Sequence, residues 1–116
     1  MHPNPNIRKH SHILKDVTIL DAIEHDEFID LLANCRLTIT DSGGIQEESA
    51  FLKKKCLICR KTTERPEGLG VFSKLVHSPE DLPKLFEETY RDYMPKGICP
   101  YGNGHASDMI VEYLRR

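Results

Sequence analysis

The sequence predicts an α/β fold built around a parallel β-sheet. Short apolar or β-branched runs at Val17–Leu20, Leu37–Thr40 and Cys56–Arg60 alternate with longer segments of helical periodicity. Strands that alternate with helices are typical of parallel sheets, because each crossover helix covers a face of the sheet. The chain has 116 residues, which is enough for one small domain with a modest core.

The amino-terminal quarter is polar before the first apolar run. Residues 1–16 contain Pro3 and Pro5, which predict an extended entry followed by a short helix. Val17–Leu20 is then predicted as a short strand, and Asp26–Asn34 as a helix. The side chains expected to face inward from this helix are Phe28, Ile29, Leu31 and Leu32.

The middle of the chain predicts two strands joined by a helix. Leu37–Thr40 is β-branched and apolar, Ile45–Leu52 contains good helix formers, and Cys56–Arg60 is the next strand. A loop with Pro66 follows, and a short strand is expected near Lys74–Val76.

Two helices are predicted in the carboxyl-terminal part. Ser78-Pro79-Glu80-Asp81 is a good helix start, with a capping residue, a proline in the first turn and early acids. Pro95 and Gly97 end that helix, and the last helix runs from about His105 to Leu114. Expected inward positions are Leu82, Leu85, Phe86 and Tyr90 in the first, and Ala106, Ile110, Val111 and Leu114 in the second.

Composition argues against several classes of protein. The net charge is −2 and no basic stripe is present, so a nucleic-acid partner is not indicated. No apolar run approaches the roughly 18 residues of a membrane span, and the polar amino terminus is unlike a signal peptide, so a cytoplasmic protein is expected. Cys56 and Cys59 have the spacing of a metal or redox pair, but residues three apart on a strand face opposite sides. No metal site is therefore predicted.

The stretch from Thr40 to Glu48 is the most informative motif. It places a Ser42-Gly43-Gly44 turn between a strand and the amino terminus of a helix. The first N–H groups of a helix have no partner within it, and the helix dipole adds partial positive charge, so such a turn suits an anion such as phosphate. The alternative is a tight structural connection that binds nothing.

Three segments are predicted to converge on one edge of the sheet. The Ser42 turn, Arg60 and the loop Thr62–Glu67 each follow the carboxyl end of a predicted strand. Ligands of parallel sheets bind beyond these ends, which favours a single nucleotide site.

Four motifs together resemble the UDP-N-acetylglucosamine 2-epimerases. They are His2–Ile7, Asp41–Glu48, Arg60–Glu67 and Pro100–His105, in the order of that family and with nearly its spacing. The resemblance implies that residues 1–116 form part of the carboxyl-terminal, Rossmann-like domain of a glycosyltransferase-B fold. This domain would be incomplete at its amino-terminal end, and the amino-terminal catalytic domain would be absent.

The resemblance also implies a set of site residues. Ser42, Gly43 and Gly44 would bind the diphosphate of UDP, Glu48 the ribose hydroxyls, and Arg60 would lie near the uracil. The same resemblance implies that His2 is the active-site histidine. It also implies that the active-site cleft is lined by Asp41, Thr63, Glu64 and Arg65.

The implied reaction inverts C2 of UDP-N-acetylglucosamine by elimination and re-addition of UDP, without a cofactor. Its acid–base carboxylates come from an amino-terminal domain that no part of this chain matches. The expected partners are therefore UDP or the UDP-sugar, and that missing domain or subunit. The complete enzyme is expected to form a homo-oligomer. A non-catalytic nucleotide-sugar-binding module and a fragment without activity are the alternatives.

The chain departs from the family in three places, one of which is a slightly shorter loop at Gly68–Ser73. Lys53-Lys54-Lys55 stands where the family usually has Gly-Lys-Pro. The resemblance implies that two strands which precede Met1 in the family are lacking here, and in the usual strand order these strands lie in the middle of the sheet. A chain without them is expected to have an exposed edge at Leu37–Thr40 and to be marginally stable or to self-associate.

Overall fold

The computed structural model describes residues 4–116 and divides the chain into two compact units. The first unit extends to Leu31 and the second comprises Leu32–Arg116. The first contains helix α1 (Pro5–Arg8), a 3₁₀ helix (Ser11–Ile13) and most of α2, which spans His25–Asn34. Asn4 caps α1, because its side-chain oxygen accepts a hydrogen bond from the Asn6 N–H at 2.9 Å.

The second unit contains a three-stranded parallel sheet in the order β1-β2-β3. The strands are β1 (Leu37–Thr40), β2 (Lys55–Ile58) and β3 (Ser73–Leu75), and Cys56 of β2 pairs with Thr38 on one side and Ser73 on the other. The predicted α/β class with a parallel sheet is therefore confirmed.

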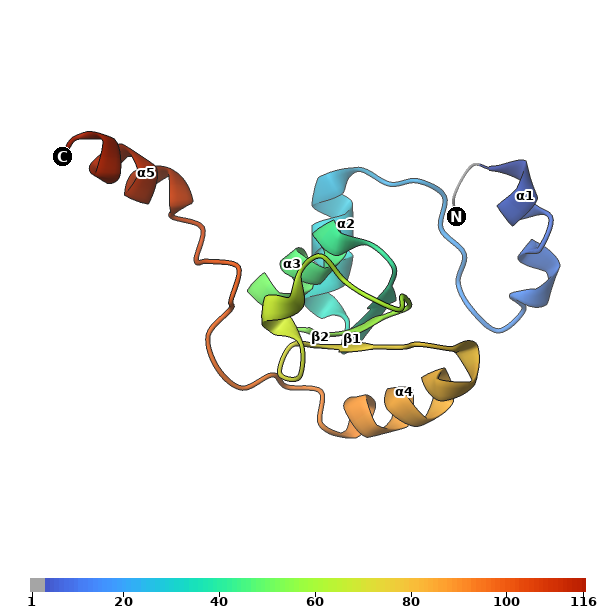
Figure 1. Cartoon of the computed structure of the whole chain (residues 1–116). Coiled ribbons are helices and arrows are strands. Elements are labelled where there is room, and N and C mark those ends of the chain that lie inside the picture. Colours follow the sequence, from blue (N-terminus) through green and yellow to red (C-terminus); the bar gives the residue numbers. More distant parts are fainter. Residues whose placement is uncertain (1–3) are drawn as a thin grey trace. The chain divides into compact units, whose positions relative to one another are not determined.

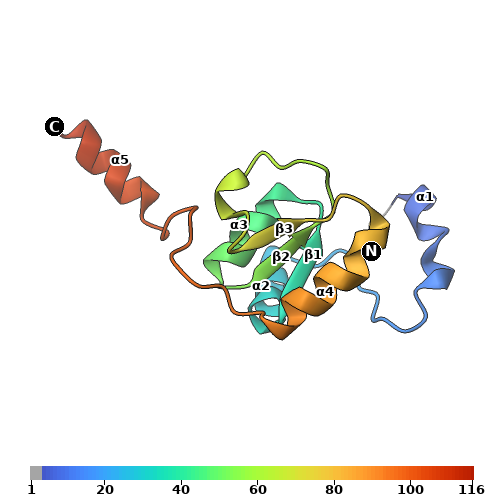
Figure 2. The ribbon, with the colours of Figure 1, turned by 60° about the horizontal axis from the view of Figure 1, so that its bottom comes forward.

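Two helices lie on opposite faces of this sheet. Figures 1 and 2 agree that α3 (Gly43–Phe51) covers one face and α4 (Leu82–Arg91) the other. Short 3₁₀ helices at Pro66–Gly68 and Pro79–Asp81 precede β3 and α4, and α5 (Ala106–Leu114) is the last helix. The central strand β2 is the best-buried element, with Cys56, Leu57 and Ile58 at most 1% exposed.

The predicted strand at Val17–Leu20 is wrong. These residues form no regular structure, and Val17, Ile19 and Leu20 are 59%, 42% and 46% exposed. A strand needs a neighbouring strand to pair its backbone groups. Among residues 4–116, the named strands are β1, β2 and β3 alone, and none of them pairs with this segment.

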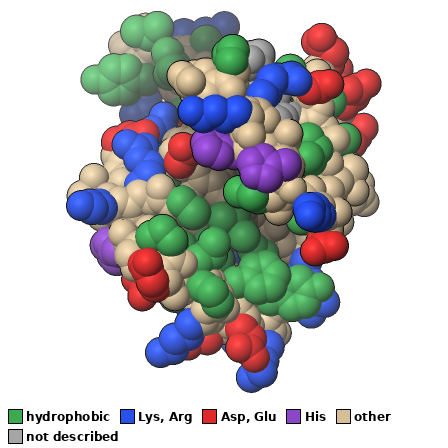
Figure 3. Space-filling model, turned by 90° about the vertical axis from the view of Figure 1, so that its right-hand side faces the viewer, with side chains coloured by type: hydrophobic (Ala, Val, Ile, Leu, Met, Phe, Trp, Pro, Cys, Tyr) green, Lys and Arg blue, Asp and Glu red, His purple; other side chains and the backbone are tan. Residues whose placement is uncertain are grey.

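Predicted helices form where expected, but several predicted inward faces are wrong. In α5, Ile110, Val111 and Leu114 are 59%, 46% and 76% exposed, and Ala106 is exposed too. Leu31 of α2 and Phe86 and Tyr90 of α4 are also exposed, whereas Leu32 is buried. Figure 3 shows hydrophobic side chains gathered on one face of the molecule. Helix formation needs only local hydrogen bonds, whereas burial of a helix face needs a neighbour.

The departure at Lys53 has a structural consequence. Lys53 has a φ angle of 59°, in the left-handed region, directly after Leu52, which caps the carboxyl end of α3. Helices commonly end on a glycine in this conformation, since a Cβ atom strains it. Lysine therefore occupies a position that suits glycine.

Replacing Lys53 with glycine is expected to stabilise the fold. Relief of the left-handed strain is worth about 1 kcal/mol. The losses are an exposed hydrogen bond from Lys53 Nζ to the Gly97 carbonyl and a contact of Nζ with the Phe72 ring, 5.6 Å from its centroid. A gain of that size raises the melting temperature by about 4–8 °C in a domain of this size. Lys53→Ala is the control, because it loses the same bond but keeps the strained Cβ. Equal melting temperatures for the two variants would contradict the explanation.

Candidate functional site

The turn between β1 and α3 is a helix amino terminus with a serine cap. Helix α3 begins at Gly43, two residues earlier than predicted, so both glycines lie in its first turn. Ser42 is the N-cap, and its hydroxyl oxygen accepts a hydrogen bond from the Ile45 N–H at 3.4 Å. The hydroxyl hydrogen of Ser42 can still donate to a ligand.

Two backbone donors at this turn are open to a ligand. The N–H groups of Gly43 and Gly44 have no hydrogen-bond partner within residues 4–116. Gly44 is exposed, and a Cβ atom placed on it would meet only Ser42 Oγ, at 3.8 Å. The turn thus has two unpaired backbone donors and open space beside Gly44, which suit an anion.

Arg65 and Glu64 lie against the same turn from the loop after β2. A Cβ atom on Gly43 would lie 2.5 Å from Arg65 Nη1 and 2.7 Å from Glu64 Oε1. A side chain at position 43 would therefore displace the ends of these two loop side chains. The Arg65 guanidinium and the Glu64 carboxylate thus both lie beside Gly43.

A chain of ion pairs joins α3 to this loop. Arg65 Nε contacts Glu47 Oε1 at 2.6 Å, Arg65 Nη1 contacts Glu64 Oε1 at 2.8 Å, and Arg60 Nη1 contacts Glu64 Oε2 at 2.9 Å. A hydrogen bond from its own backbone N–H, together with the charges of Arg60 and Arg65, lowers the pKa of Glu64. The hydrogen bond from Arg65 to Glu47 raises the pKa of the guanidinium. Both groups therefore stay charged at neutral pH.

The structure gathers most of the predicted site residues at the carboxyl ends of β1 and β2. Asp41 is exposed beside the Ser42 cap, and Glu48 is half-buried on α3. Thr63 is half-buried in the loop and contacts α3 through its hydroxyl. The predicted catalytic histidine, His2, lies outside the described residues.

Sequence reasoning missed a buried polar cluster behind this site. Gln46 is 2% exposed and hydrogen bonds to Thr63, Arg65 and Tyr101. Gln46 and Tyr101 both stand within the motifs that carry the family resemblance, which was the one available signal. Glu47, the next residue of α3, accepts a hydrogen bond from Arg65 Nε.

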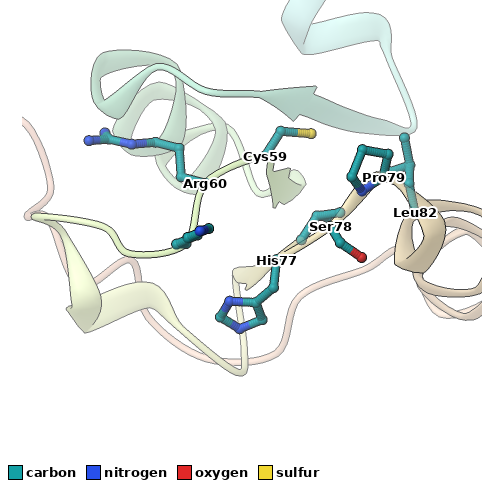
Figure 4. Close-up of a pocket in the computed structure, with 8 residues that line it drawn as sticks. Cys59, Arg60, His77, Ser78, Pro79 and Leu82 are labelled. Atoms are coloured by element: carbon teal, nitrogen blue, oxygen red, sulfur yellow. The ribbon is translucent and has the colours of Figure 1, made fainter.

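A second hollow lies on the same edge of the sheet. A cavity of about 280 Å³ is found where β2 and β3 end (Figure 4). Cys59, Arg60 and Lys61 line one side, and residues 76–79 with Leu82 line the other. Figure 4 shows the Arg60 side chain extending away from the Cys59 thiol. Arg60 thus borders this cavity while its guanidinium pairs with Glu64.

The cysteines do not form a metal or redox centre in residues 4–116. All four are free, and within these residues no cluster of three metal-binding side chains exists. Cys56 is buried in β2, whereas Cys59 is exposed beyond the end of this strand. Within the same range, no helix is long and apolar enough to cross a membrane.

Comparison with known proteins identifies the family. The family model described as UDP-N-acetylglucosamine 2-epimerase matches residues 1–115. The chain belongs to the UDP-N-acetylglucosamine 2-epimerase family. The UDP-N-acetylglucosamine 2-epimerases of Escherichia coli K12 and Neisseria meningitidis are 37% and 38% identical to it, over 99% and 98% of its length. In both cases the chain spans 34% of the relative, which is about a third of its length.

Solved structures of UDP-N-acetylglucosamine 2-epimerases have the same fold. The S. aureus MnaA–UDP co-structure matches with a TM-score of 0.86 and 31% identity, over 99% of this chain and 34% of that one. The Methanocaldococcus jannaschii UDP-GlcNAc 2-epimerase in complex with UDP-GlcNAc and UDP matches with a TM-score of 0.77 and 35% identity, over 95% and 31%. The predicted family, and the predicted class of an α/β, Rossmann-like domain of the glycosyltransferase-B type, are confirmed.

Proposed function

We propose that this chain is the UDP-binding part of a UDP-N-acetylglucosamine 2-epimerase. In this proposal the N–H groups of Gly43 and Gly44 and the Ser42 hydroxyl donate hydrogen bonds to the diphosphate. Glu48 accepts from the ribose hydroxyls, and Arg60 lies toward the uracil. His2, Asp41, Thr63, Glu64 and Arg65 complete the cleft.

One observation carries the proposal: the backbone N–H groups of Gly43 and Gly44 are unpaired among residues 4–116, and the Arg65 guanidinium lies beside Gly43. Each of the two donor types suits an anion on its own, and together they suit a diphosphate, which has several negatively charged oxygens. That the S. aureus and M. jannaschii relatives were solved with UDP supports the same ligand here.

The site geometry supports one half of the epimerase chemistry. Elimination of UDP from the sugar places negative charge on the leaving diphosphate, and donors fixed in advance stabilise that charge. The proton at C2 must also be removed and returned by a carboxylate of suitable pKa. In the family this carboxylate belongs to an amino-terminal domain, so we propose that turnover requires an amino-terminal half in addition to this chain.

Two further properties belong to the proposal. The complete enzyme is expected to be a homo-oligomer in the cytoplasm, and residues 1–116 to be its incomplete carboxyl-terminal domain. The exposed apolar residues of α5 are consistent with a partner surface on this helix.

The isolated chain is expected to bind UDP without epimerising UDP-N-acetylglucosamine. Calorimetry measures the binding of UDP, and exchange of the C2 proton in heavy water measures the reaction. Turnover well above a control without protein would contradict the need for an amino-terminal half.

Uridine and inorganic pyrophosphate are the matched ligand controls. Binding of UDP but not uridine is expected, because the free N–H groups and Arg65 recognise the diphosphate. No binding of UDP by a folded chain would contradict the proposed function and favour a fragment without independent activity. Binding with no recovery of turnover when an amino-terminal half is added would favour a non-catalytic binding module.

A further inference from the structure

Gln46 is a buried polar side chain between α3 and the loop that carries Arg65. It is 2% exposed, although it lies in the first turns of a helix whose neighbouring Gly44 is at the surface. Its Oε1 accepts a hydrogen bond from the Thr63 hydroxyl at 2.9 Å, and its Nε2 donates to the Arg65 carbonyl at 2.8 Å. One amide therefore contacts the loop at two positions.

The backbone of Arg65 is held from both sides by this cluster. Its N–H donates to Thr63 Oγ1 at 3.1 Å, and its carbonyl also accepts from the Tyr101 hydroxyl at 2.9 Å. Gln46 Nε2 donates its second hydrogen to Tyr101 Oη at 3.2 Å, so each hydroxyl both donates and accepts. The contact of Nε2 with Ser73 Oγ is longer, at 3.4 Å.

The cluster sets where the guanidinium lies. With the Arg65 backbone held against α3, Nη1 lies over Gly43 and Nε reaches Glu47 at 2.6 Å. Only a side-chain amide supplies one acceptor and two donors in this arrangement. We propose that Gln46 is a positioning residue that fixes Arg65 beside the amino terminus of α3 through the backbone of the loop Thr63–Arg65. This inference rests on the proposed function, because it assigns the held arginine to the anion site.

Amide hydrogen exchange tests the positioning without any ligand. In Gln46→Leu, the Arg65 N–H is expected to exchange at least tenfold faster, because Thr63 loses the acceptor that orients its hydroxyl. The N–H groups of Cys59 and Val76 donate within the sheet, to Thr40 and Ile58, and are expected to keep their rates. Unchanged exchange at Arg65, or equal acceleration at Arg65 and Val76, would overturn the inference.

The affinity for UDP tests the consequence at the site. Gln46→Leu is expected to bind UDP about fivefold more weakly than the native chain. Gln46→Glu places a carboxylate against the Arg65 carbonyl. At pH 8 this variant should therefore bind UDP at least as weakly as Gln46→Leu does. Burial raises the pKa of a carboxyl, and its protonated form can donate to that carbonyl. The affinity of Gln46→Glu relative to native should therefore recover toward pH 5.5, while that of Gln46→Leu should not.

A milder variant keeps the inference open to refutation if Gln46 variants fail to fold. Tyr101→Phe removes a single hydroxyl from the Arg65 carbonyl, and a smaller acceleration of the same Arg65 N–H is expected. No acceleration in this variant would overturn the inference.

Absence of UDP binding by the native chain would refute the proposed function alone, since the exchange measurement would still decide the role of Gln46. A Gln46→Glu affinity without pH-dependent recovery would refute the donor role of its amide.

Discussion

Gly44→Val is expected to weaken UDP binding by at least tenfold while leaving the fold intact. A Cβ atom at Gly44 meets only Ser42 Oγ, at 3.8 Å, so the protein itself has room for the new side chain. A diphosphate bound to the free N–H groups of Gly43 and Gly44, as proposed, would lie close to this new side chain. Loss of a hydrogen bond to a charged group costs about 1.5–3 kcal/mol, which corresponds to tenfold or more in affinity.

Calorimetry with UDP measures this effect, and thermal unfolding checks the fold. Gly44→Ala is expected to be intermediate, because a methyl group fills less of the anion space. Phe51→Val introduces the same side chain at the exposed far end of α3 and is expected to bind UDP like the native chain. Equal UDP affinity in folded Gly44→Val would rule out the diphosphate position.

Arg65→Ala is expected to weaken UDP binding by about ten- to a hundredfold, and Arg60→Ala by much less. Arg65 lies within contact distance of Gly43, and the variant removes its charge while leaving Glu47 without its partner and Glu64 paired with Arg60 alone. A charge-assisted contact to phosphate accounts for the expected size. Arg60 contacts Glu64 in an exposed pair, and such pairs contribute little.

Salt dependence separates a direct ionic contact from a loss of structure. Raising the salt concentration should weaken UDP binding more for the native chain than for Arg65→Ala, because the variant lacks the cation that salt screens. Arg65→Lys keeps the charge but lacks the planar fork, so it should recover part of the affinity. A larger loss in Arg60→Ala than in Arg65→Ala would reverse the order proposed for the two arginines.

Local signals made the strand–turn–helix of the site predictable. Leu37–Thr40 is β-branched and apolar, Ser42 is a good helix cap, and Gly43-Gly44 allows close approach. All of these preferences act within about ten residues, and the structure has the strand at the predicted residues. The helix start was wrong by two residues, since glycine is weak evidence for a helix but is tolerated in its first turn.

Elements whose formation depends on a distant partner were less predictable. Val17–Leu20 has the composition of a strand but no neighbour to pair with among the described residues. The α5 helix was predicted correctly, yet its apolar residues are exposed, because periodicity reports a helix face and not what covers it.

The amino-acid sequence by itself determined the family, the α/β class and the turn that can bind an anion. Its motifs are contiguous, and their backbone preferences are local. Only the tertiary structure decided how Arg65 meets Gly43 and which residues hold it there. The partners of Gln46 lie 17, 19 and 55 residues away, at Thr63, Arg65 and Tyr101. Contacts over such separations depend on how the loop after β2 and the segment before α5 pack onto α3, and no local pattern encodes that packing.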